Sequence, residues 1–281
     1  MGRDGFKDVV TVGCWLPARD DAEMTDGVPL DHLASEPPVA AIPARVDVRE
    51  LELPLDLYEL DPRDGLTVNR AHLALMADCL GRHGIAFQIP EPRPIPWGRH
   101  EQQYGLTDEA RAAHYGYHVP EITDRPHPRE PALPDDIADD CLDWARRRLN
   151  QGVPDLAQPR LAQMLALRTH LLSREDSRVR AVFGAWSRCM RDLGFSYPDP
   201  MAANNDSAFA TEEPTEDEMR VAVADVRCKR TVGVVEVWSA VESAYQRRAI
   251  DAHHDQLELI RQAIQVRLAN AHAVLAGLSG R

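Results

Sequence analysis

One combination of cysteine and glycine occurs twice in this chain of 281 residues. Residues 79–92 read CLGRHGIAFQIPEP and residues 189–200 read CMRDLGFSYPDP, so in both a cysteine is followed by a glycine, an aromatic residue and a proline. Glycine readily adopts the left-handed backbone conformation that ends many helices, and proline cannot continue one. Both stretches therefore predict the end of a helix, and the repeat predicts two helical units of similar design.

Each repeated cysteine is followed along the chain by another cysteine in a predicted helix, Cys79 by Cys141 and Cys189 by Cys228. The simplest interpretation is one disulfide in each unit, Cys79–Cys141 and Cys189–Cys228. Four cysteines allow three connectivities, and the repeat selects this one. The alternative is a cytosolic protein in which all five cysteines are reduced and buried as small apolar residues. A zinc site is disfavoured, because the chain has no C-x-x-C pair with matching histidine spacing.

Apolar residues at helical spacing predict a mainly α-helical fold. The predicted helices span residues 67–83, 107–115, 134–151, 159–172, 176–193 and 215–230. Beyond Gly233 the pattern continues to the C-terminus through Leu257, Ile260, Ile264, Leu268, Ala271, Leu275 and Leu278. It predicts a single helix of roughly 45 residues. The apolar stripe of this helix could face a partner chain, but we favour packing against the protein's own helices.

Three segments are predicted along the chain. Residues 1–65 form an acidic, partly disordered arm, in which leucines at period two predict a short extended segment at 51–58. Residues 66–152 form a first helical unit with a proline-rich loop region, and residues 153–281 form a second unit with the long C-terminal helix. The predicted fold class is thus a mainly α, internally duplicated helical bundle with a proline-rich connecting region.

The charge and hydropathy of the chain exclude some classes of partner. The formal net charge of −13 argues against nucleic acid, because binding phosphates requires a basic surface. Residues 1–60 carry most of this charge, with 13 acidic and 5 basic side chains. No run of about 18 apolar residues occurs, so no transmembrane segment is predicted. A peptide or protein partner is compatible with this composition, and the oligomeric state is left open.

Amphipathic rings gather in the proline-rich region 95–120. The candidate ligand-binding residues are Trp97, Tyr104, His114, Tyr115, Tyr117 and His118. Such rings suit recognition of a peptide or a glycan, and they equally suit a structural lid whose rings pack while their polar atoms form hydrogen bonds. We favour the lid.

Motifs that carry catalysis are weak in this sequence. His114 and His118 are four residues apart, which on a helix would place both on one face for a metal. Gly116 between them predicts a helix stop, and no glutamate stands where an H-E-x-x-H motif has its base. No G-x-S-x-G, Walker or G-x-G-x-x-G motif occurs either. No catalytic residue, metal ligand or cofactor is assigned, and the favoured interpretation is a protein without enzymatic activity.

Several motifs together resemble a family of small secreted, lipoprotein-like helical proteins of unassigned function from high-GC Gram-positive bacteria. They are LPLDLYELDP, CLGRHG, YGLTDEARAAHYGYHVP, WSRCMRDLGFSYPDP and ADVRC, within residues 53–281. The most specific are YGYH and the two cysteine–glycine units. The resemblance implies an extracytoplasmic or cell-surface, disulfide-bearing helical protein of a kind that often accompanies export systems. It assigns no catalytic residues.

The N-terminal region is compatible with either of two compartments, extracytoplasmic or cytoplasmic. Cys14 in VVTVGC resembles the lipid-attachment cysteine of bacterial lipoproteins, but the apolar stretch before it is too short for a signal peptide. Either an upstream start precedes this chain, or this version is cytoplasmic and Cys14 is a free thiol.

The favoured function is a non-enzymatic extracytoplasmic accessory or binding protein, associated with export or with peptide binding. One alternative is an intracellular partner or tailoring protein of a biosynthetic pathway, with reduced thiols on the same scaffold. The other is a metal-dependent enzyme that uses His114 and His118.

Overall fold

The computed structural model describes residues 31–87, 89, 98–119 and 134–279. The α-helices are α1 (Pro62–Arg82), α2 (Glu109–Tyr115), α3 (Asp135–Leu149), α4 (Leu161–Glu175), α5 (Ser177–Asp192), α6 (Pro200–Asn204), α7 (Glu216–Val232), α8 (Val234–Ala252) and α9 (His254–Ser279). Short 3-10 helices are η3 (Asp31–Leu33), η4 (Pro54–Tyr58) and η5 (Ser207–Phe209). These residues contain no β-strand, so the predicted mainly helical fold is confirmed.

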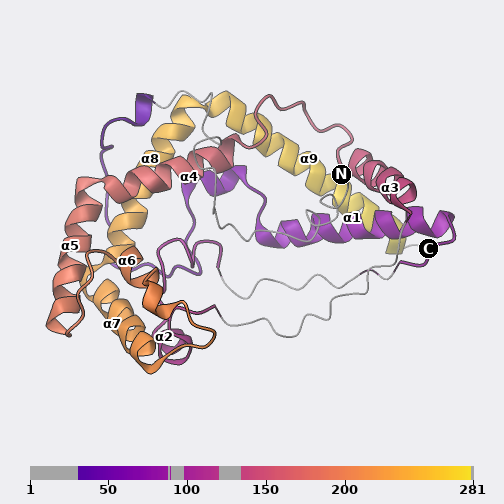
Figure 1. The fold of residues 1–281 in the computed structure, drawn as a ribbon. Helices are drawn as coiled ribbons and strands as arrows, with labels where there is room; N and C mark the ends of the chain where they lie inside the picture. The colour runs from indigo at the N-terminus through magenta and orange to yellow at the C-terminus, as the bar shows by residue number, and fades with distance from the viewer. Residues whose placement is uncertain (1–30, 88, 90–97, 120–133, 280–281) are drawn as a thin grey trace.

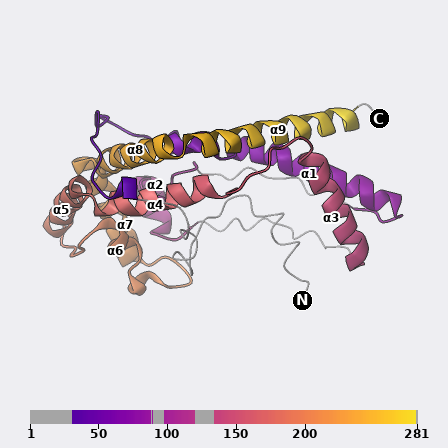
Figure 2. The same ribbon diagram turned by 90° about the horizontal axis from the view of Figure 1, so that it is seen from above.

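Two groups of helices are connected by α9 (Figure 1, Figure 2). Helices α4, α5, α7 and α8 lie at one end, α1 and α3 lie at the other, and α9 runs from the first group to the second. The larger hydrophobic core includes Leu257 and Ile260 from the start of α9. The smaller core, between α1 and α3, includes Ala271 from further along the same helix. The C-terminal helix therefore packs on the protein's own helices, as favoured from the sequence.

Segments that precede the second predicted unit also contribute to the larger core. Leu33, Leu55 and Tyr58 from the predicted arm are buried in it. Helix α2 packs on α7, where Ala112 is buried in one cluster with Ala222 and Val226. Segments that come early in the chain therefore pack on helices that come late in it, so the spatial groups of helices do not follow the order of the sequence.

The repeated cysteine–glycine stretches end α1 and α5 in the same way. Gly84 has φ 74° and Gly194 has φ 91°, both in the left-handed region. The amide after each glycine donates to the carbonyl of the residue after the cysteine, with N···O distances of 3.0 Å in the first copy and 2.9 Å in the second. This hydrogen bond is characteristic of a Schellman motif. The sequence repeat therefore corresponds to a repeated helix C-cap.

The predicted extended segment at 51–58 is wrong, since most of it forms η4. Leu53 and Leu55 are buried, whereas Leu57 is 70% exposed, so the leucines do not share one face. The local reason is a turn. The carboxylate of Asp56 accepts a hydrogen bond from the amide of Leu53 at 2.7 Å, which closes the chain on itself.

The single helix predicted beyond Gly233 is divided in two. His253, with φ −121° and ψ 22°, lies outside helical geometry and separates α8 from α9. Its imidazole packs against that of His32 in η3, with ring centroids 5.2 Å apart. After the bend, α9 runs from the larger core to α1, on which it packs (Figure 1).

Each core contains one disulfide. The structure joins Cys79 to Cys141 and Cys189 to Cys228, with sulfur–sulfur distances of 1.99 and 1.97 Å, and these are the pairs that the repeat predicts. The first bridge links α1 to α3, and the second links α5 to α7. Cys14 lies outside the described residues.

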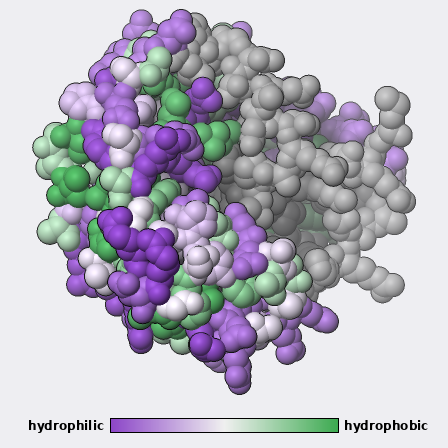
Figure 3. Space-filling view, turned by 60° about the vertical axis from the view of Figure 1, so that its left-hand side comes forward, coloured by the Kyte–Doolittle hydropathy of each residue, from purple (hydrophilic) through white to green (hydrophobic). Residues whose placement is uncertain are grey.

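The surface is mixed in character. On the face shown in Figure 3, hydrophobic residues are scattered among hydrophilic ones. In the described part of the chain, no helix combines the length and apolar character needed to cross a bilayer. The predicted absence of a transmembrane segment agrees with this finding.

Replacing Cys79 and Cys141 together by serine is expected to lower the free energy of unfolding by about 4 kcal/mol, because the unlinked unfolded chain gains conformational entropy. The Cys189→Ser, Cys228→Ser variant should lose a similar amount, since loop-closure entropy changes only slowly with the separations of 62 and 39 residues. Urea unfolding followed by circular dichroism measures both.

The control is the intact mass of the unfolded, unreduced wild-type protein after alkylation. Four cysteines should be protected and Cys14 labelled. Labelling of all five cysteines in protein recovered from an oxidising compartment would contradict the disulfide assignment, as would double variants that are as stable as the wild type.

Candidate functional site

Three carboxylates on α7 and α8 are fully buried, those of Glu218, Asp225 and Glu242. Each one is contacted by a histidine or tyrosine side chain from residues 98–119, the segment that contains most of the predicted ligand-binding rings. A buried carboxylate is strongly unfavourable unless its oxygens accept hydrogen bonds or face a cation. Residues 98–119 therefore form a polar cover over these two helices, and we call them the covering segment.

Glu242 lies at the centre of the largest polar cluster. Its carboxylate accepts from the Tyr104 hydroxyl at 2.9 Å and from the Gln103 amide at 2.6 Å. His170 on α4 contacts it at 3.0 Å, and Gln246 donates from one turn further along α8 at 3.2 Å. Burial and the charge of Glu242 raise the pKa of Tyr104 well above its usual range, so this hydroxyl remains a donor.

The cluster continues towards the surface through a histidine with two acceptors. His100 donates from Nδ1 to Gln103 at 2.7 Å and from Nε2 to the Asp56 carboxylate at 2.8 Å. Arg99 contacts the other oxygen of Asp56 at 3.2 Å. Because both ring nitrogens face oxygen acceptors, this arrangement favours the imidazolium form.

The pKa values of this pair move in opposite directions. Burial alone would lower the pKa of His100, but the hydrogen bond and charge of Asp56, with Gln103 and Glu242, outweigh burial and raise it. Burial alone would raise the pKa of Asp56, but His100, the Leu53 amide and Arg99 lower it. Each group thus stabilises the charged form of the other.

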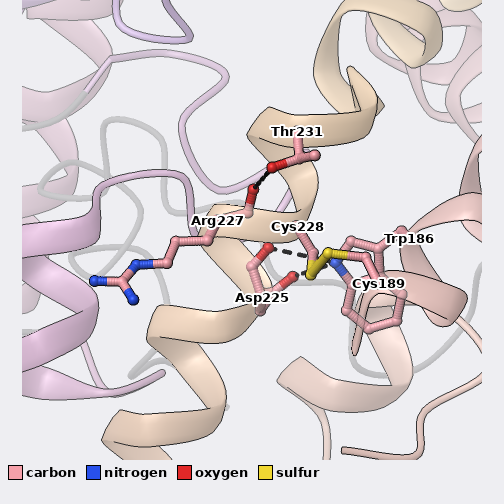
Figure 4. Close-up of a disulfide and its surroundings, with 6 residues drawn as sticks. All are labelled: Trp186, Cys189, Asp225, Arg227, Cys228 and Thr231. Atoms are coloured by element: carbon pink, nitrogen blue, oxygen red, sulfur yellow. Dashed lines mark hydrogen bonds between the residues drawn. A yellow bond between two sulfur atoms is a disulfide. The ribbon is translucent and has the colours of Figure 1, made fainter. Parts of the chain in front are cut away.

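Asp225 forms the second buried cluster, next to the Cys189–Cys228 bridge (Figure 4). Its carboxylate accepts from the Trp186 indole at 3.0 Å, from the Lys229 ammonium at 2.8 Å and from the Tyr117 hydroxyl at 3.2 Å. Lys229 is itself buried and also donates to the main chain of the covering segment. Burial raises the pKa of Asp225, and Lys229 opposes this rise.

Glu218 holds the far end of the covering segment. It forms the predicted capping box with Thr215 at the start of α7, and its carboxylate also accepts from the amide of Tyr117 at 2.7 Å. His118 contacts the same carboxylate at 2.8 Å. A Cβ on Gly116 would lie 2.4 Å from this carboxylate, and its φ is 56°, so only glycine allows the chain to approach so closely.

The predicted ligand-binding rings do not gather in one site. Tyr104 is fully buried, and Tyr117 and His118 point towards α7. His114 is exposed and packs edge-on against the half-buried Tyr115, with ring centroids 4.5 Å apart. Trp97 lies outside the described residues.

His118 has a partner on each ring nitrogen. Besides Glu218, it donates to the carbonyl of Thr211 at 2.8 Å. The Thr211 carbonyl and Glu218 raise the pKa of His118. Within the described ranges, one group of three potential metal ligands lies close together, and it contains neither His114 nor His118. The geometry of this pair therefore gives no support to a metal site between them.

Sequence reasoning missed a pocket of about 270 Å³ between the arm and α8. It is lined by Val39, Ala40, Ala41, Pro43, Val46, Leu51, Ser239, Ala240, Ser243 and Arg247. Arg247 is exposed, and no described residue pairs with its guanidinium. The only sequence signal was the spacing of Ser239, Ser243 and Arg247, which places them on one face of α8. The apolar lining residues between Val39 and Val46 show no regular period.

Comparisons with known proteins add no assignment. No family profile, curated protein or solved structure gave a significant match to the chain. The similarity to secreted, lipoprotein-like proteins stays an expectation from the motifs. The function is therefore inferred from the geometry of the described residues.

Tyr104→Phe is expected to lower the free energy of unfolding by about 1–3 kcal/mol, because it leaves the buried Glu242 carboxylate with one donor fewer. Tyr115→Phe is the matched control, since that ring is only half buried, and its effect should stay within about 0.5 kcal/mol. Urea unfolding measures both variants. Equal stability of the two would show that the Tyr104 hydroxyl does not support the core.

The stability of the folded protein is expected to fall as pH rises above about 6.5. Since the pKa of His100 is raised above its usual 6.5, its contribution is complete below that pH and is lost as pH rises through the folded-state pKa. Since the pKa of Asp56 is lowered below 3.8, its contribution is present above that pH and is lost as pH falls through the folded-state value. The pair therefore stabilises most between about pH 4 and 6.5.

Urea midpoints across this range test the expectation. His100→Gln should flatten the fall above about pH 6.5, leaving a smaller slope from His118, whose pKa is also raised. His272→Gln, at an exposed position on α9, should keep the wild-type slope. An unchanged slope in His100→Gln would contradict the assignment.

Proposed function

We propose that this protein is a non-enzymatic, extracytoplasmic binding protein that captures the carboxyl-terminal end of a peptide. The observation that carries the proposal is the pocket between residues 39–51 and α8, which combines apolar walls with the unpaired guanidinium of Arg247 among the described residues. The predicted recognition rings are unsuited to this role, because Tyr104, Tyr117 and His118 bond to buried carboxylates.

The disulfides support the proposed compartment. Disulfides persist in oxidising environments such as the cell exterior and the periplasm, and they are rare in the cytosol. One bridge in each core would tie both helical groups under such conditions. The compartment implied by the motif resemblance is the same.

The hydrogen bonds of His100 and His118 support a role without catalysis. A general base needs an unprotonated atom within reach of a substrate. Both ring nitrogens of His100 and of His118 already face oxygen acceptors. These histidines therefore serve the stability of the covering segment.

The size and chemistry of the pocket indicate the class of ligand. A pocket of about 270 Å³ lies just below the range of about 300–1,000 Å³ that is typical of sites for drug-sized ligands, so it has room for an apolar side chain together with the polar group beside it. A guanidinium binds a carboxylate through two parallel hydrogen bonds. An apolar side chain and a carboxylate on the same residue occur together at the end of a peptide. The serines on α8 offer further hydrogen bonds to its main chain.

Isothermal titration calorimetry with an N-acetylated pentapeptide that ends in leucine tests the proposal. The free acid is expected to bind at least about tenfold more tightly than the C-terminal amide, because a charge-assisted hydrogen bond contributes about 1.5–3 kcal/mol. Arg247→Gln should abolish this difference. Arg147→Gln, an exposed arginine on α3, should preserve it.

The proposal fails if the acid and the amide bind equally to the wild-type protein, or if neither binds at millimolar concentration. It also fails if Arg247→Gln discriminates between them as well as the wild type does.

A further inference from the structure

We propose that reduction of the Cys79–Cys141 disulfide converts this pair, together with His83, into a site for zinc. The sulfur atoms of the two cysteines and a ring nitrogen of His83 all lie within 4.8 Å of one another. No other group of three potential ligands this close occurs in the described part of the chain. The inference is independent of the peptide pocket, which lies on α8.

The end of α1 places two of the ligands. Cys79 and His83 are four residues apart, so their side chains lie on the same face of the last helical turn. His83 is the C-cap residue, and it is exposed, with no side-chain partner among the described residues. Cys141 comes from α3 and is fully buried. The site is therefore anchored in the smaller core and open to solvent on the histidine side.

The donor set suits zinc. Thiolate and imidazole are the usual ligands of this ion, at about 2.3 Å for sulfur and about 2.0–2.1 Å for nitrogen. A C-x3-H spacing on one helix end plus one cysteine from a neighbouring helix gives three ligands. Three protein ligands leave the fourth tetrahedral position for water or for an external ligand. The two helices would thus stay linked in the reduced protein, through the metal instead of the disulfide.

Conversion of the disulfide into a zinc site requires an external reductant. A reductant such as a dithiol or a phosphine supplies two electrons, which break the S–S bond, and two protons give two thiols. A dithiol is itself oxidised to a disulfide, and a phosphine takes oxygen from water to become a phosphine oxide. Binding of Zn²⁺ then releases both thiol protons, because only the thiolate coordinates the metal.

The second disulfide provides an internal control. Cys189 and Cys228 have no third potential ligand within the same reach among the described residues. The carboxylate of Asp225 beside them accepts a hydrogen bond from Trp186 (Figure 4) and another from Lys229. Reduction of this pair should therefore create no comparable site.

Cobalt titration of the full chain, reduced with a phosphine under anaerobic conditions, tests the inference. Co²⁺ is the probe because thiolate coordination gives a charge-transfer band in the near ultraviolet, and four-coordinate geometry gives intense bands in the visible. We expect one Co²⁺ per reduced chain, displaced by Zn²⁺, and no such bands in the oxidised protein. His83→Ala should weaken binding tenfold or more.

Paired variants distinguish Co²⁺ binding at this site from Co²⁺ binding by the other reduced cysteines. The Cys189→Ser, Cys228→Ser variant should bind Co²⁺ as the wild type does, and the Cys79→Ser, Cys141→Ser variant should not. If reduction lowers the helical signal in circular dichroism, Co²⁺ should restore it in the wild type and not in His83→Ala. Absence of binding to the reduced wild type, equal affinity of His83→Ala, or binding retained without Cys79 and Cys141 would overturn the proposal.

Discussion

The three carboxylates buried on α7 and α8 fix the position of the covering segment, residues 98–119. Glu218, Asp225 and Glu242 have no access to water, so their oxygens must be bonded within the protein. The covering segment supplies Tyr104, Tyr117 and His118 for this purpose. Three rings that the sequence predicts as candidate ligand-binding residues are therefore bonded to buried carboxylates.

Because these rings are bonded to buried carboxylates, a binding surface must be sought elsewhere on the molecule. The described residues combine an apolar hollow with an unpaired cation at the pocket beside α8, and they bring three potential metal ligands together at the end of α1. The two places are in different helical groups, which are connected by α9. Because each group has its own core and its own disulfide, the redox chemistry proposed for one leaves the peptide pocket proposed for the other in place.

Several features that depend on neighbouring residues were predictable. The glycines that end α1 and α5, and the capping box of Thr215, act through hydrogen bonds within a few residues, so the local sequence contains all their partners. The disulfide pairs are long-range, but the repeat of one helix end was sufficient to select them. The extended segment at 51–58 and the uninterrupted C-terminal helix failed, since the turn at Asp56 and the packing of His253 on His32 leave no periodic signal.

The sequence by itself thus determined the helical class, the glycine stops of α1 and α5, the capping box of α7 and the pairing of four cysteines. Only the tertiary structure decided the direction of the rings in the covering segment, the bend before α9 and the pocket beside α8. The physical reason is the distance along the chain between partners. Tyr104 and Glu242 are 138 residues apart, and His118 and Glu218 are 100 apart, so a pattern read within one helix cannot show that a buried charge elsewhere requires these donors.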